Sequence, residues 1–318
     1  MKVSVLGCGR WGSFHASYSC NIGNDVILWG RENSGNLLRL QQTRCNDYIH
    51  LPNGIALTDD LERAVDHAEV MIVSISAQQF RSFAQVLAQY DTKGKVLILC
   101  MKGIEQGTGK RLSQVASEYI QDADIAVWVG PGHVQSYVRQ VPNCMLVASD
   151  DHALTKWIVE AFNSNLIRLY IGEDLIGAEV GAAAKNVIGI AAGMLDGVGY
   201  NSLKGALMAR GAREVARLIK AMGGDEITAY GLSHLGDYEA TLFSSYSNNR
   251  RFGEAFVKGE RFDKLAEGAY TIPAMLDLAQ CHQVELPITQ AMNDIVYANA
   301  EPMGAMRQLF LRTVKGEF

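Results

Sequence analysis

Short apolar runs alternate with amphipathic stretches through the first half of the chain. The runs are rich in Val and Ile and are apolar throughout instead of alternating, as strands buried on both faces of a parallel sheet are. They cover residues 2–7, 25–30, 69–76, 95–103, 125–132 and 144–149. Helical stretches such as LERAVDHA (61–68) and QVLAQYDTK (85–93) lie between them. The alternation predicts a doubly wound α/β domain with a mostly parallel sheet.

The pattern changes after about residue 150. Asp150 or Asp151 can cap a helix, ALTKWIVEAF, and NLIRLYIG (165–172) reads as one more strand. From there the pattern is nearly all helical. The expected helices cover residues 177–197, 202–222, 273–283 and 287–299. Because 318 residues exceed what one core usually holds, we expect two domains: a dinucleotide-binding domain at 1–173 and a helical substrate-binding, catalytic domain at 174–318.

The first apolar run leads into GCGRWG (7–12), a GxGxxG pattern that opens a helical stretch. Gly7 allows a tight turn, Gly9 lets the backbone approach a pyrophosphate, and Gly12 lets helix pack on strand. The pyrophosphate then rests on the helix N-terminus. A second strand ends at Trp29, about 20 residues on, which is the context that the fingerprint requires. The alternative, a tight turn with no ligand, is the weaker one here.

The tip of the second strand bears on cofactor choice. Arg31 favours the 2′-phosphate of NADP, whereas an acidic residue such as Glu32 would accept from the ribose hydroxyl of NAD. The sequence therefore leaves NADP or NAD open, with NADP favoured. Arg31 as an exposed loop charge is the competing interpretation.

Composition narrows the classes of protein. A net charge of −5 and a pI near 5.8 give no indication of nucleic-acid or anionic-membrane binding. The six cysteines form no CxxC pair, which is typical of reduced, cytoplasmic thiols, and the seven histidines form no metal motif. No run of 18 apolar residues occurs and the N-terminus is no signal peptide, so we expect no membrane span.

Further stretches carry candidate chemistry. They are MKGIE (101–105), VGPG (129–132), EVGAAAKNV (179–187), RGARE (210–214), GD (236–237), SSYSNNRRFG (244–253) and AEGAYT (266–271). The stretch at 244–253 shows no apolar periodicity, so by itself it is interpreted as a solvated loop. The alternative is a phosphate-binding segment, because Arg, Asn and Ser are side chains that donate hydrogen bonds to phosphate. Taken together with GxGxWG, these motifs resemble NAD(P)-dependent glycerol-3-phosphate dehydrogenases from end to end.

That resemblance implies a Rossmann-like N-terminal domain, a helical C-terminal domain, and interconversion of sn-glycerol 3-phosphate and dihydroxyacetone phosphate for phospholipid synthesis. Lys185 would exchange the proton with the reacting oxygen, and Lys102, Asp237 and Thr241 would line the reaction centre. Residues implied to touch the substrate are Lys102, Gly130, Gly132, Lys185, Asp237, Ser247, Asn248 and Asn249. Residues implied to touch the cofactor are Gly7, Gly9, Arg10, Trp11, Gly12, Arg31, Lys102, Val134, Asn248, Leu265 and Glu267.

The residues themselves support these roles. Hydride transfer to a ketone creates an alkoxide, which needs a proton and a nearby cation. A lysine on an apolar helix is desolvated, which lowers its pKa towards neutrality. The competing interpretations are a snorkelling Lys185 and an Asp237 that serves only as a turn residue.

The chain departs from the family pattern around the phosphate. Asn248 stands where the family usually has arginine, and a neutral hydrogen bond to phosphate is weaker than a bidentate charged one. Arg250 and Arg251 are the nearby cations. Gly132 and Ser136 lack a family hydroxyl and carboxylate, and Arg10 replaces a small residue.

Three functions remain open at this point. One is the family reaction, whose small-molecule partner is a phosphorylated substrate. The second is a dehydrogenase reaction on another polyol phosphate, a phosphonate or a hydroxy compound. The third is a non-catalytic NAD(P) sensor, which retention of Lys102, Lys185, Asp237 and Thr241 argues against. We further expect a cytoplasmic homodimer with no metal.

Overall fold

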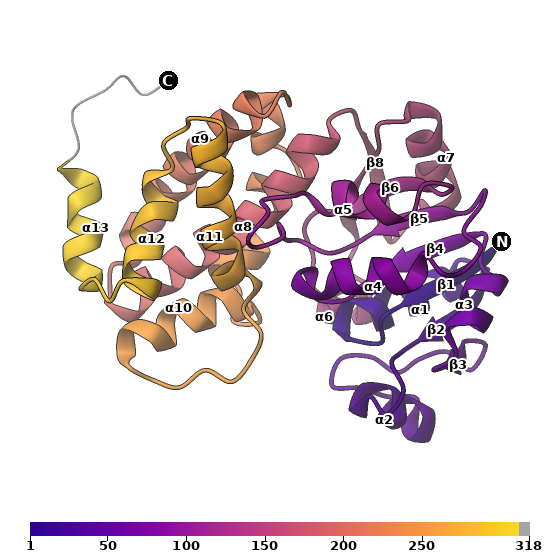
Figure 1. Cartoon of the computed structure of the whole chain (residues 1–318). Coiled ribbons are helices and arrows are strands. Elements are labelled where there is room, and N and C mark those ends of the chain that lie inside the picture. Colours follow the sequence, from indigo (N-terminus) through magenta and orange to yellow (C-terminus); the bar gives the residue numbers. More distant parts are fainter. Residues whose placement is uncertain (312–318) are drawn as a thin grey trace. The chain divides into compact units, whose positions relative to one another are not determined.

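The computed structural model describes residues 1–311, which divide into two compact units. The first comprises residues 1–101 and 112–173; the second comprises residues 102–111 and the chain from Asp174 onward. Figure 1 follows the chain from the indigo strands of the first unit to the yellow helices of the second.

The first unit is built on one mixed sheet. Within the described residues, its eight strands have the order β3-β2-β1-β4-β5-β6-β7-β8, and all neighbours are parallel except β6 and β7. The strands are β1 (Lys2–Leu6), β2 (Asp25–Trp29), β3 (Ala56–Thr58), β4 (Val70–Val73), β5 (Val96–Leu99), β6 (Asp124–Val129), β7 (Asn143–Ala148) and β8 (Ile167–Gly172). The predicted mostly parallel, Rossmann-like sheet is confirmed; the short β3 gave no apolar run of its own. The order reverses between β1 and β4, where such sheets bind ligands.

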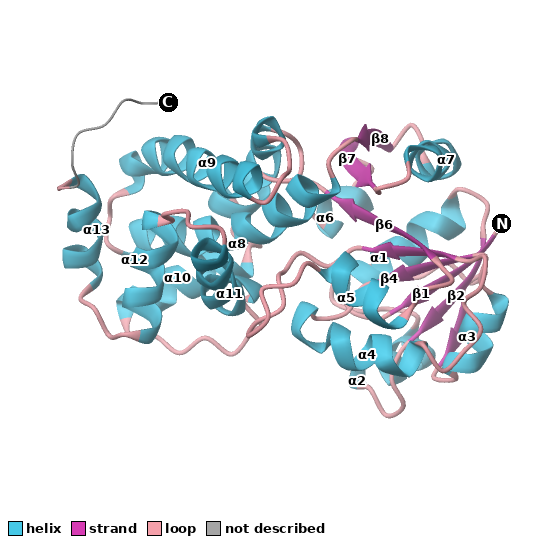
Figure 2. Ribbon diagram, turned by 45° about the horizontal axis from the view of Figure 1, so that its top comes forward, coloured by secondary structure: helices cyan, strands magenta, loops and turns pink. Residues whose placement is uncertain are grey.

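Helices flank this sheet, as Figure 2 shows in cyan beside the magenta strands. They are α1 (Arg10–Asn21), α2 (Gly35–Thr43), α3 (Leu61–His67), α4 (Phe80–Leu87), α5 (Leu112–Tyr119), α6 (Val134–Val138) and α7 (His152–Phe162). Asp151 caps α7 by accepting from the backbone N–H groups of Ala153 and Leu154, as its position predicts. The helix expected over 85–93 is wrong: α4 ends at Leu87 and a turn follows, with Gly94 at φ 69°.

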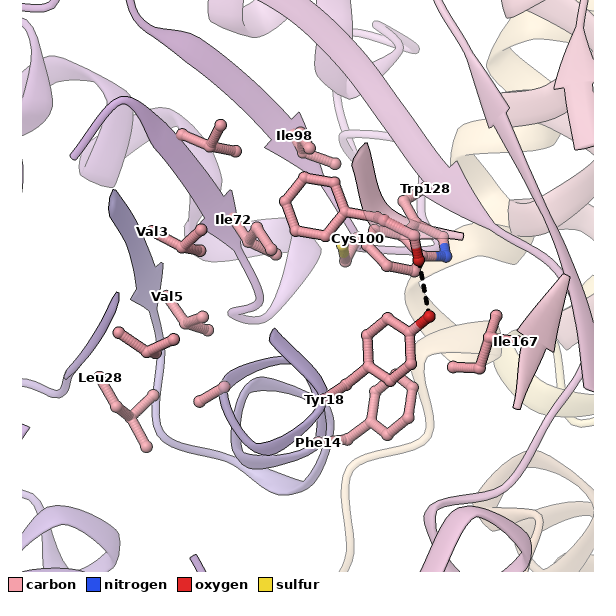
Figure 3. Packing of buried hydrophobic residues seen from close by; sticks show 14 of the residues in the cluster. Val3, Val5, Phe14, Tyr18, Leu28, Ile72, Ile98, Cys100, Trp128 and Ile167 are labelled. Carbon is pink, nitrogen blue, oxygen red and sulfur yellow. Dashed lines mark hydrogen bonds between the residues drawn. The ribbon is translucent and has the colours of Figure 1, made fainter. Parts of the chain in front are cut away.

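Buried aromatic and branched side chains fill the space between α1 and the sheet (Figure 3). Phe14 and Tyr18 of α1 stack with ring centroids 6.0 Å apart, and Tyr18 meets Trp128 of β6 edge-on. The Tyr18 hydroxyl donates to the Phe162 carbonyl at 2.6 Å, the dashed line of Figure 3. This packing fixes α1, and with it the turn that precedes the helix, against the strand ends.

The second unit is helical. Its helices are α8 (Leu175–Gly197), α9 (Lys204–Ala221), α10 (Asn248–Lys258), α11 (Glu267–Cys281), α12 (Pro287–Tyr297) and α13 (Pro302–Phe310), with 3₁₀ turns at Asn201–Leu203, Glu226–Tyr230 and Leu235–Asp237 and a π-helix at Glu239–Phe243. Helices α9, α10, α11 and α12 all pack on α8. Among the described helices, α8 alone is long and apolar enough to cross a membrane, but 94% of its apolar window is buried, as in the core helix of a globular domain.

The expectation of a loop at 244–253 is wrong for most of that stretch, because α10 begins at Asn248. Ser247 caps the helix and accepts from the Arg250 N–H at 3.3 Å. The helix packs on α8 through glycines: a Cβ at Gly253 would lie 2.1 Å from the Ile190 carbonyl oxygen. A backbone-to-backbone contact of this kind leaves no apolar signal, and of the α10 side chains that pack on the helical core, Phe252 lies at the end of the stretch and Val257 lies beyond it.

Residues 102–111 follow a strand of the sheet yet belong to the helical unit. Ile104 and Arg111 form an antiparallel bridge, and Ile104 is fully buried in the helical core. Arg111 Nη1 lies 2.6 Å from Glu179 Oε2 of α8 in a largely buried ion pair. The segment is therefore fastened to α8 at both of its ends, since Lys102 is also held there, as described next.

Candidate active site

The turn between β1 and α1 has the geometry of a dinucleotide-binding loop. Gly7 has φ 119°, and a Cβ there would lie 2.2 Å from the Ser74 carbonyl oxygen that follows β4. A Cβ at Gly12 would lie 1.7 Å from the Gly7 carbonyl oxygen, so helix and turn touch only because both residues are glycine.

Gly9 differs from the other two glycines. Within the described part of the chain, no atom comes within 4 Å of a Cβ built there, and no side chain caps α1. The backbone at Gly9 is thus open at the N-terminus of a 12-residue helix, where an anion gains from N–H groups and the helix dipole. The residues fit a dinucleotide pyrophosphate.

Other residues expected at the cofactor surround this turn in the first unit. Trp11 lies in α1, partly buried against the core, and the guanidinium carbon of Arg10 lies 5.4 Å from the centre of the Tyr48 ring. Arg31 is exposed one residue beyond Gly30, where a Cβ would lie 2.4 Å from Cys8 Sγ. Arg10 and Arg31 therefore add positive charge beside a loop suited to an anion.

The residues after β6 also belong to the first unit. Gly130 and Gly132 have φ values of 127° and 141°, which favour glycine, and Val134 begins α6 as a buried side chain. A Cβ at Gly132 would lie 2.4 Å from Asn143 Nδ2. The Asn143 side chain therefore occupies the space that a serine or threonine at position 132 would need. Their expected contacts with substrate and cofactor stay predictions.

In the second unit, two lysines converge on one carboxylate oxygen. Lys102 Nζ lies 2.7 Å from Asp237 Oδ2, and Lys185 Nζ forms an ion pair with the same oxygen. Lys185 also donates to Thr241 Oγ1 at 2.9 Å, and the Thr241 hydroxyl donates to the Asp237 carbonyl at 2.7 Å. The structure thus brings together all four residues expected at the reaction centre.

Burial makes this cluster chemically unusual. It is the largest cause that lowers the pKa of Lys185, from 10.5 to about 7, and the charge of Lys102 lowers it further while Asp237 raises it. Near neutral pH the Lys185 amine is therefore divided between charged and neutral forms, as a proton donor and acceptor should be.

Two atoms of the cluster remain available for a ligand. Asp237 Oδ1 is buried and has no hydrogen-bond partner among the described residues. Lys185 has three N–H groups, of which Asp237 and Thr241 accept two. An unpaired buried carboxylate oxygen is costly, and a hydroxyl from a bound molecule would satisfy it.

Asn186, to which the sequence assigned no role of its own, ties the cluster together. Its Nδ2 donates to the Lys102 carbonyl at 2.9 Å, and its Oδ1 accepts from Asn249 Nδ2 at 2.9 Å. Asn249 Oδ1 in turn accepts from the Gly268 N–H at 2.9 Å. The sequence signal that could have identified Asn186 is its polar amide, which lies next to Lys185 on a helix of mostly small apolar residues.

The segment expected to hold the substrate phosphate covers the start of α10. Ser247 Oγ accepts from the Arg250 N–H, which leaves its O–H free to donate. Asn248 Nδ2 donates to the Leu265 carbonyl at 3.0 Å, so this amide is already engaged. Arg250 Nε lies 2.5 Å from Asp196 Oδ2, and Arg251 stacks over Phe262. Neither arginine stands in for the cation that Asn248 lacks.

Leu265 and Glu267, expected near the cofactor, flank the start of α11. The Leu265 side chain is exposed, and Glu267 is the first residue of the helix. Within the described residues no group of three or more His, Cys, Asp or Glu side chains could hold a metal ion.

Comparison with known proteins gives one answer for both units. The family model for the N-terminus of NAD-dependent glycerol-3-phosphate dehydrogenase matches residues 2–155, and that for its C-terminus matches residues 174–307. A glycerol-3-phosphate dehydrogenase [NAD(P)+] of Thermoanaerobacter sp. is 34% identical over 328 residues, covering 100% of this chain and 99% of the relative.

Two further similarities extend over the whole chain. The corresponding enzyme of Prosthecochloris aestuarii is 33% identical over 332 residues, covering 100% of both chains. The crystal structure of glycerol-3-phosphate dehydrogenase from Coxiella burnetii superposes with a TM-score of 0.90 at 26% identity, covering 98% of each chain.

Proposed function

This chain belongs to the NAD-dependent glycerol-3-phosphate dehydrogenase family, and we propose that it interconverts sn-glycerol 3-phosphate and dihydroxyacetone phosphate. It is an NAD(P)-dependent oxidoreductase that acts on a CH–OH group. The observation that carries the reaction is the convergence of Lys102 and Lys185 on Asp237 Oδ2, with the pKa of Lys185 lowered to about 7 by burial.

The glycine-rich turn of the first unit is proposed to hold the cofactor. The open backbone at Gly9, the uncapped α1 and the charge of Arg10 support binding of the pyrophosphate, and the exposed Arg31 supports a preference for NADP over NAD. When bound, the nicotinamide supplies or accepts the hydride. The chain's own residues then have to manage the proton and the charge on the substrate oxygen.

Lys185 is proposed to move that proton. In the reductive direction the charged amine donates its remaining N–H to the ketone oxygen and passes the proton to it as the alkoxide forms. In the oxidative direction the neutral amine accepts the proton from the hydroxyl. Lys102 stabilises the negative oxygen, and Asp237 holds both amines at one point through Oδ2.

Thr241 and Asn186 orient these groups. Thr241 accepts from Lys185 and donates to the Asp237 carbonyl, so the amine cannot swing away from the carboxylate. Asn186 holds the backbone of Lys102 through its carbonyl. Prealigned donors of this kind lower the barrier because they need no reorganisation during the reaction.

The phosphate of the substrate is proposed to lie at the start of α10. Ser247 has a free O–H, and the N-terminal N–H groups of α10 carry the positive end of an 11-residue helix. Asn248, by contrast, donates to the Leu265 carbonyl and brings no charge. We therefore expect the substrate phosphate to be held more weakly than a bidentate arginine would hold it.

The test is oxidation of NADPH and of NADH, in parallel, by purified protein with dihydroxyacetone phosphate. We expect turnover with both cofactors and a larger kcat/KM with NADPH. Lys185→Ala is the paired variant: it should lose turnover by at least about a thousandfold, since it removes the proton donor, and still bind NADPH. Absence of turnover in the wild type, with NADPH bound, would contradict the proposal and direct the search to other hydroxy or keto substrates.

We also propose that the protein is a cytoplasmic homodimer supplying glycerol phosphate for phospholipid synthesis. Exposed apolar side chains at the edge strand β8, Tyr170 and Ile171, with Trp157 of α7, support a partner surface. All six cysteines, which lie within the described residues, are free thiols. Light scattering should give about twice the chain mass of 34.8 kDa, and a value near that of one chain would contradict the dimer.

A further inference from the structure

His234 and Tyr238 form a buried pair on either side of the turn that carries Asp237. Both side chains are fully buried, and their rings meet edge-on with centroids 4.8 Å apart. His234 precedes the 3₁₀ turn Leu235–Asp237, and Tyr238 follows it. The proposed reaction uses neither residue, although a fully buried histidine and tyrosine both need hydrogen-bond partners.

The hydrogen bonds fix the protonation of the imidazole. His234 Nδ1 lies 2.8 Å from the Gly181 carbonyl oxygen, which can only accept, so Nδ1 carries the proton. Burial, reinforced by the charge of Lys185, lowers the pKa of His234 to about 4. The ring is therefore neutral, and Nε2 accepts from the Tyr238 hydroxyl at 2.7 Å.

The bond from His234 joins the two segments that meet in the reaction centre. Gly181 precedes Lys185 by four residues on α8, so its carbonyl is the acceptor of the helical turn that ends at Lys185. His234 precedes Asp237 by three residues. The His234–Gly181 bond thus connects the same two stretches of chain as the Lys185–Asp237 ion pair, one turn away.

Glycines make room for this pair on two helices. A Cβ at Gly181 would lie 3.0 Å from His234 Cβ, which is tighter than ordinary contacts. A Cβ at Gly211 of α9 would lie 3.1 Å from the Tyr238 hydroxyl oxygen. Tyr238 therefore fits closely between α8 and α9 and holds the imidazole from the side opposite Gly181.

We propose that His234, supported by Tyr238, is a positioning residue for Lys185: it ties the segment bearing Asp237 and Thr241 to the turn of α8 that precedes the lysine. The inference rests on the proposed function, because it assigns Lys185 the proton transfer. His234 touches neither substrate nor cofactor in this role. It fixes the distance between the amine and the carboxylate through two backbone segments.

The charged groups around the pair indicate what loosening it would change. Lys185 and Asp237 face His234, Lys102 reaches Asp237 from residues 102–111, and Glu214 of α9 faces Tyr238. Burial is the largest cause of the lowered pKa of Lys185. A looser segment admits water to the amine, so the pKa of Lys185 should rise towards its ordinary value.

The test compares three variants with the wild type. His234→Leu removes both ring nitrogens at similar volume, His234→Asn keeps a donor near the Nδ1 position, and Tyr238→Phe removes one hydroxyl. We expect His234→Leu to lower kcat for dihydroxyacetone phosphate about 10- to 100-fold with KM changed less than about threefold, because misplacement affects the aligned transition state more than binding. His234→Asn should recover most of kcat, and Tyr238→Phe should fall between. His282→Leu, on an exposed histidine, is the matched control and should change nothing.

A second measurement does not depend on the substrate. The pH dependence of acetylation of Lys185 by acetic anhydride, read by mass spectrometry, gives its titration midpoint in each variant. We expect His234→Leu to raise this midpoint by about half a unit or more and Tyr238→Phe to raise it less.

The outcomes separate the inference from the proposed function. In one outcome, kcat and the Lys185 titration midpoint are unchanged in all three variants, His234→Leu, His234→Asn and Tyr238→Phe, and only the melting temperature falls. This result would overturn the positioning role and leave the reaction intact. A wild type inactive on dihydroxyacetone phosphate would overturn the reaction; a raised midpoint in His234→Leu would then still support the positioning role, and an unchanged one would overturn it too.

Discussion

Lys185 lies among Ala, Gly and Val residues on α8, and its nearest charges are Asp237 and Lys102. Its ionisation is therefore set by its surroundings instead of by water. Because burial lowers its pKa to about 7, the neutral amine predominates above that pH and the charged amine below it.

The pH dependence of kcat should follow this titration with opposite signs in the two directions. Oxidation of glycerol 3-phosphate needs the neutral amine, so kcat should rise as pH increases through about 7 and then level off. Reduction needs the charged amine, so kcat should fall over the same range. Lys102→Met removes a charge that lowers the pKa of Lys185 and should move both midpoints upward. Midpoints that stay fixed in Lys102→Met would contradict the coupling; stopped-flow rates at saturating cofactor provide the measurement.

Asn248 offers a gain of function at a single residue. Asn248→Arg places a guanidinium at the first position of α10, where it can form a bidentate pair with phosphate. We expect KM for dihydroxyacetone phosphate to fall about tenfold, which corresponds to about 1.4 kcal/mol. Steady-state kinetics across substrate concentration measures this change.

The control for this prediction is Asn248→Ala, which removes only the hydrogen bond to the Leu265 carbonyl. It should leave KM within about twofold, since a neutral amide engaged elsewhere contributes little to an anion. An arginine variant with the same KM as the alanine variant would show that the phosphate does not lie at the start of α10.

At the scale of elements, the β1–α1 turn depends on glycine for two separate reasons. Gly12 allows α1 to touch the turn, because a Cβ there would lie 1.7 Å from the Gly7 carbonyl oxygen. Gly9 has open space around it and an ordinary φ of −76°, so the fold itself tolerates a side chain at this position.

The two alanine variants should therefore fail differently. Gly12→Ala should lower the free energy of unfolding by about 2 kcal/mol or more, because backbone must move to relieve the overlap. Gly9→Ala should fold normally and bind NADPH at least about tenfold more weakly, because its methyl group occupies the space a pyrophosphate needs. Thermal melting and NADPH fluorescence titration distinguish them. Equal losses of stability in both variants would refute this assignment of roles.

At the scale of the whole molecule, residues 102–111 connect β5 to α5 of the first unit but pack with the helices of the second unit. The Arg111–Glu179 ion pair has side-chain exposures of 11% and 6%, so removing one partner leaves a charge in a poorly solvated place. All four tryptophans, by contrast, lie in the first unit. Tryptophan fluorescence therefore reports on the first unit alone, whereas far-ultraviolet circular dichroism reports on the helices of both units.

Arg111→Met should destabilise the helical unit selectively. We expect its urea transition followed by far-ultraviolet circular dichroism to move to lower urea, with a loss of about 3 kcal/mol, while the tryptophan fluorescence transition moves much less. The double variant Arg111→Met with Glu179→Met should regain most of the loss. Lys220→Met, which breaks a surface pair with Glu226, should shift the transition far less than Arg111→Met does. A double variant as unstable as Arg111→Met would contradict a direct pairing of the two charges.

The sequence alone determined the elements whose signals are local. Continuous apolar runs gave six of the eight strands of the described sheet, because strands buried on both faces need no polar partner positions, and the mixed stretch 165–172 gave β8. The glycines of the β1–α1 turn and the capping Asp151 were likewise readable, since turn and cap geometry depend on a few neighbouring residues. The resemblance to a known family, carried by short motifs, identified the reaction.

Only the tertiary structure decided what depends on contacts between distant segments. The start of helix α10 gave no periodic signal, because glycine contacts with α8 leave none and most of the apolar side chains of the helix lie beyond residue 253. The grouping of Lys102 with the helices, the bridging by Asn186 and the His234–Gly181 hydrogen bond join residues far apart in the chain, and no spacing rule encodes such distances. The same holds for the lowered pKa of Lys185: the sequence placed a lysine on an apolar helix, but the depth of its burial and the position of Asp237 exist only in the folded unit.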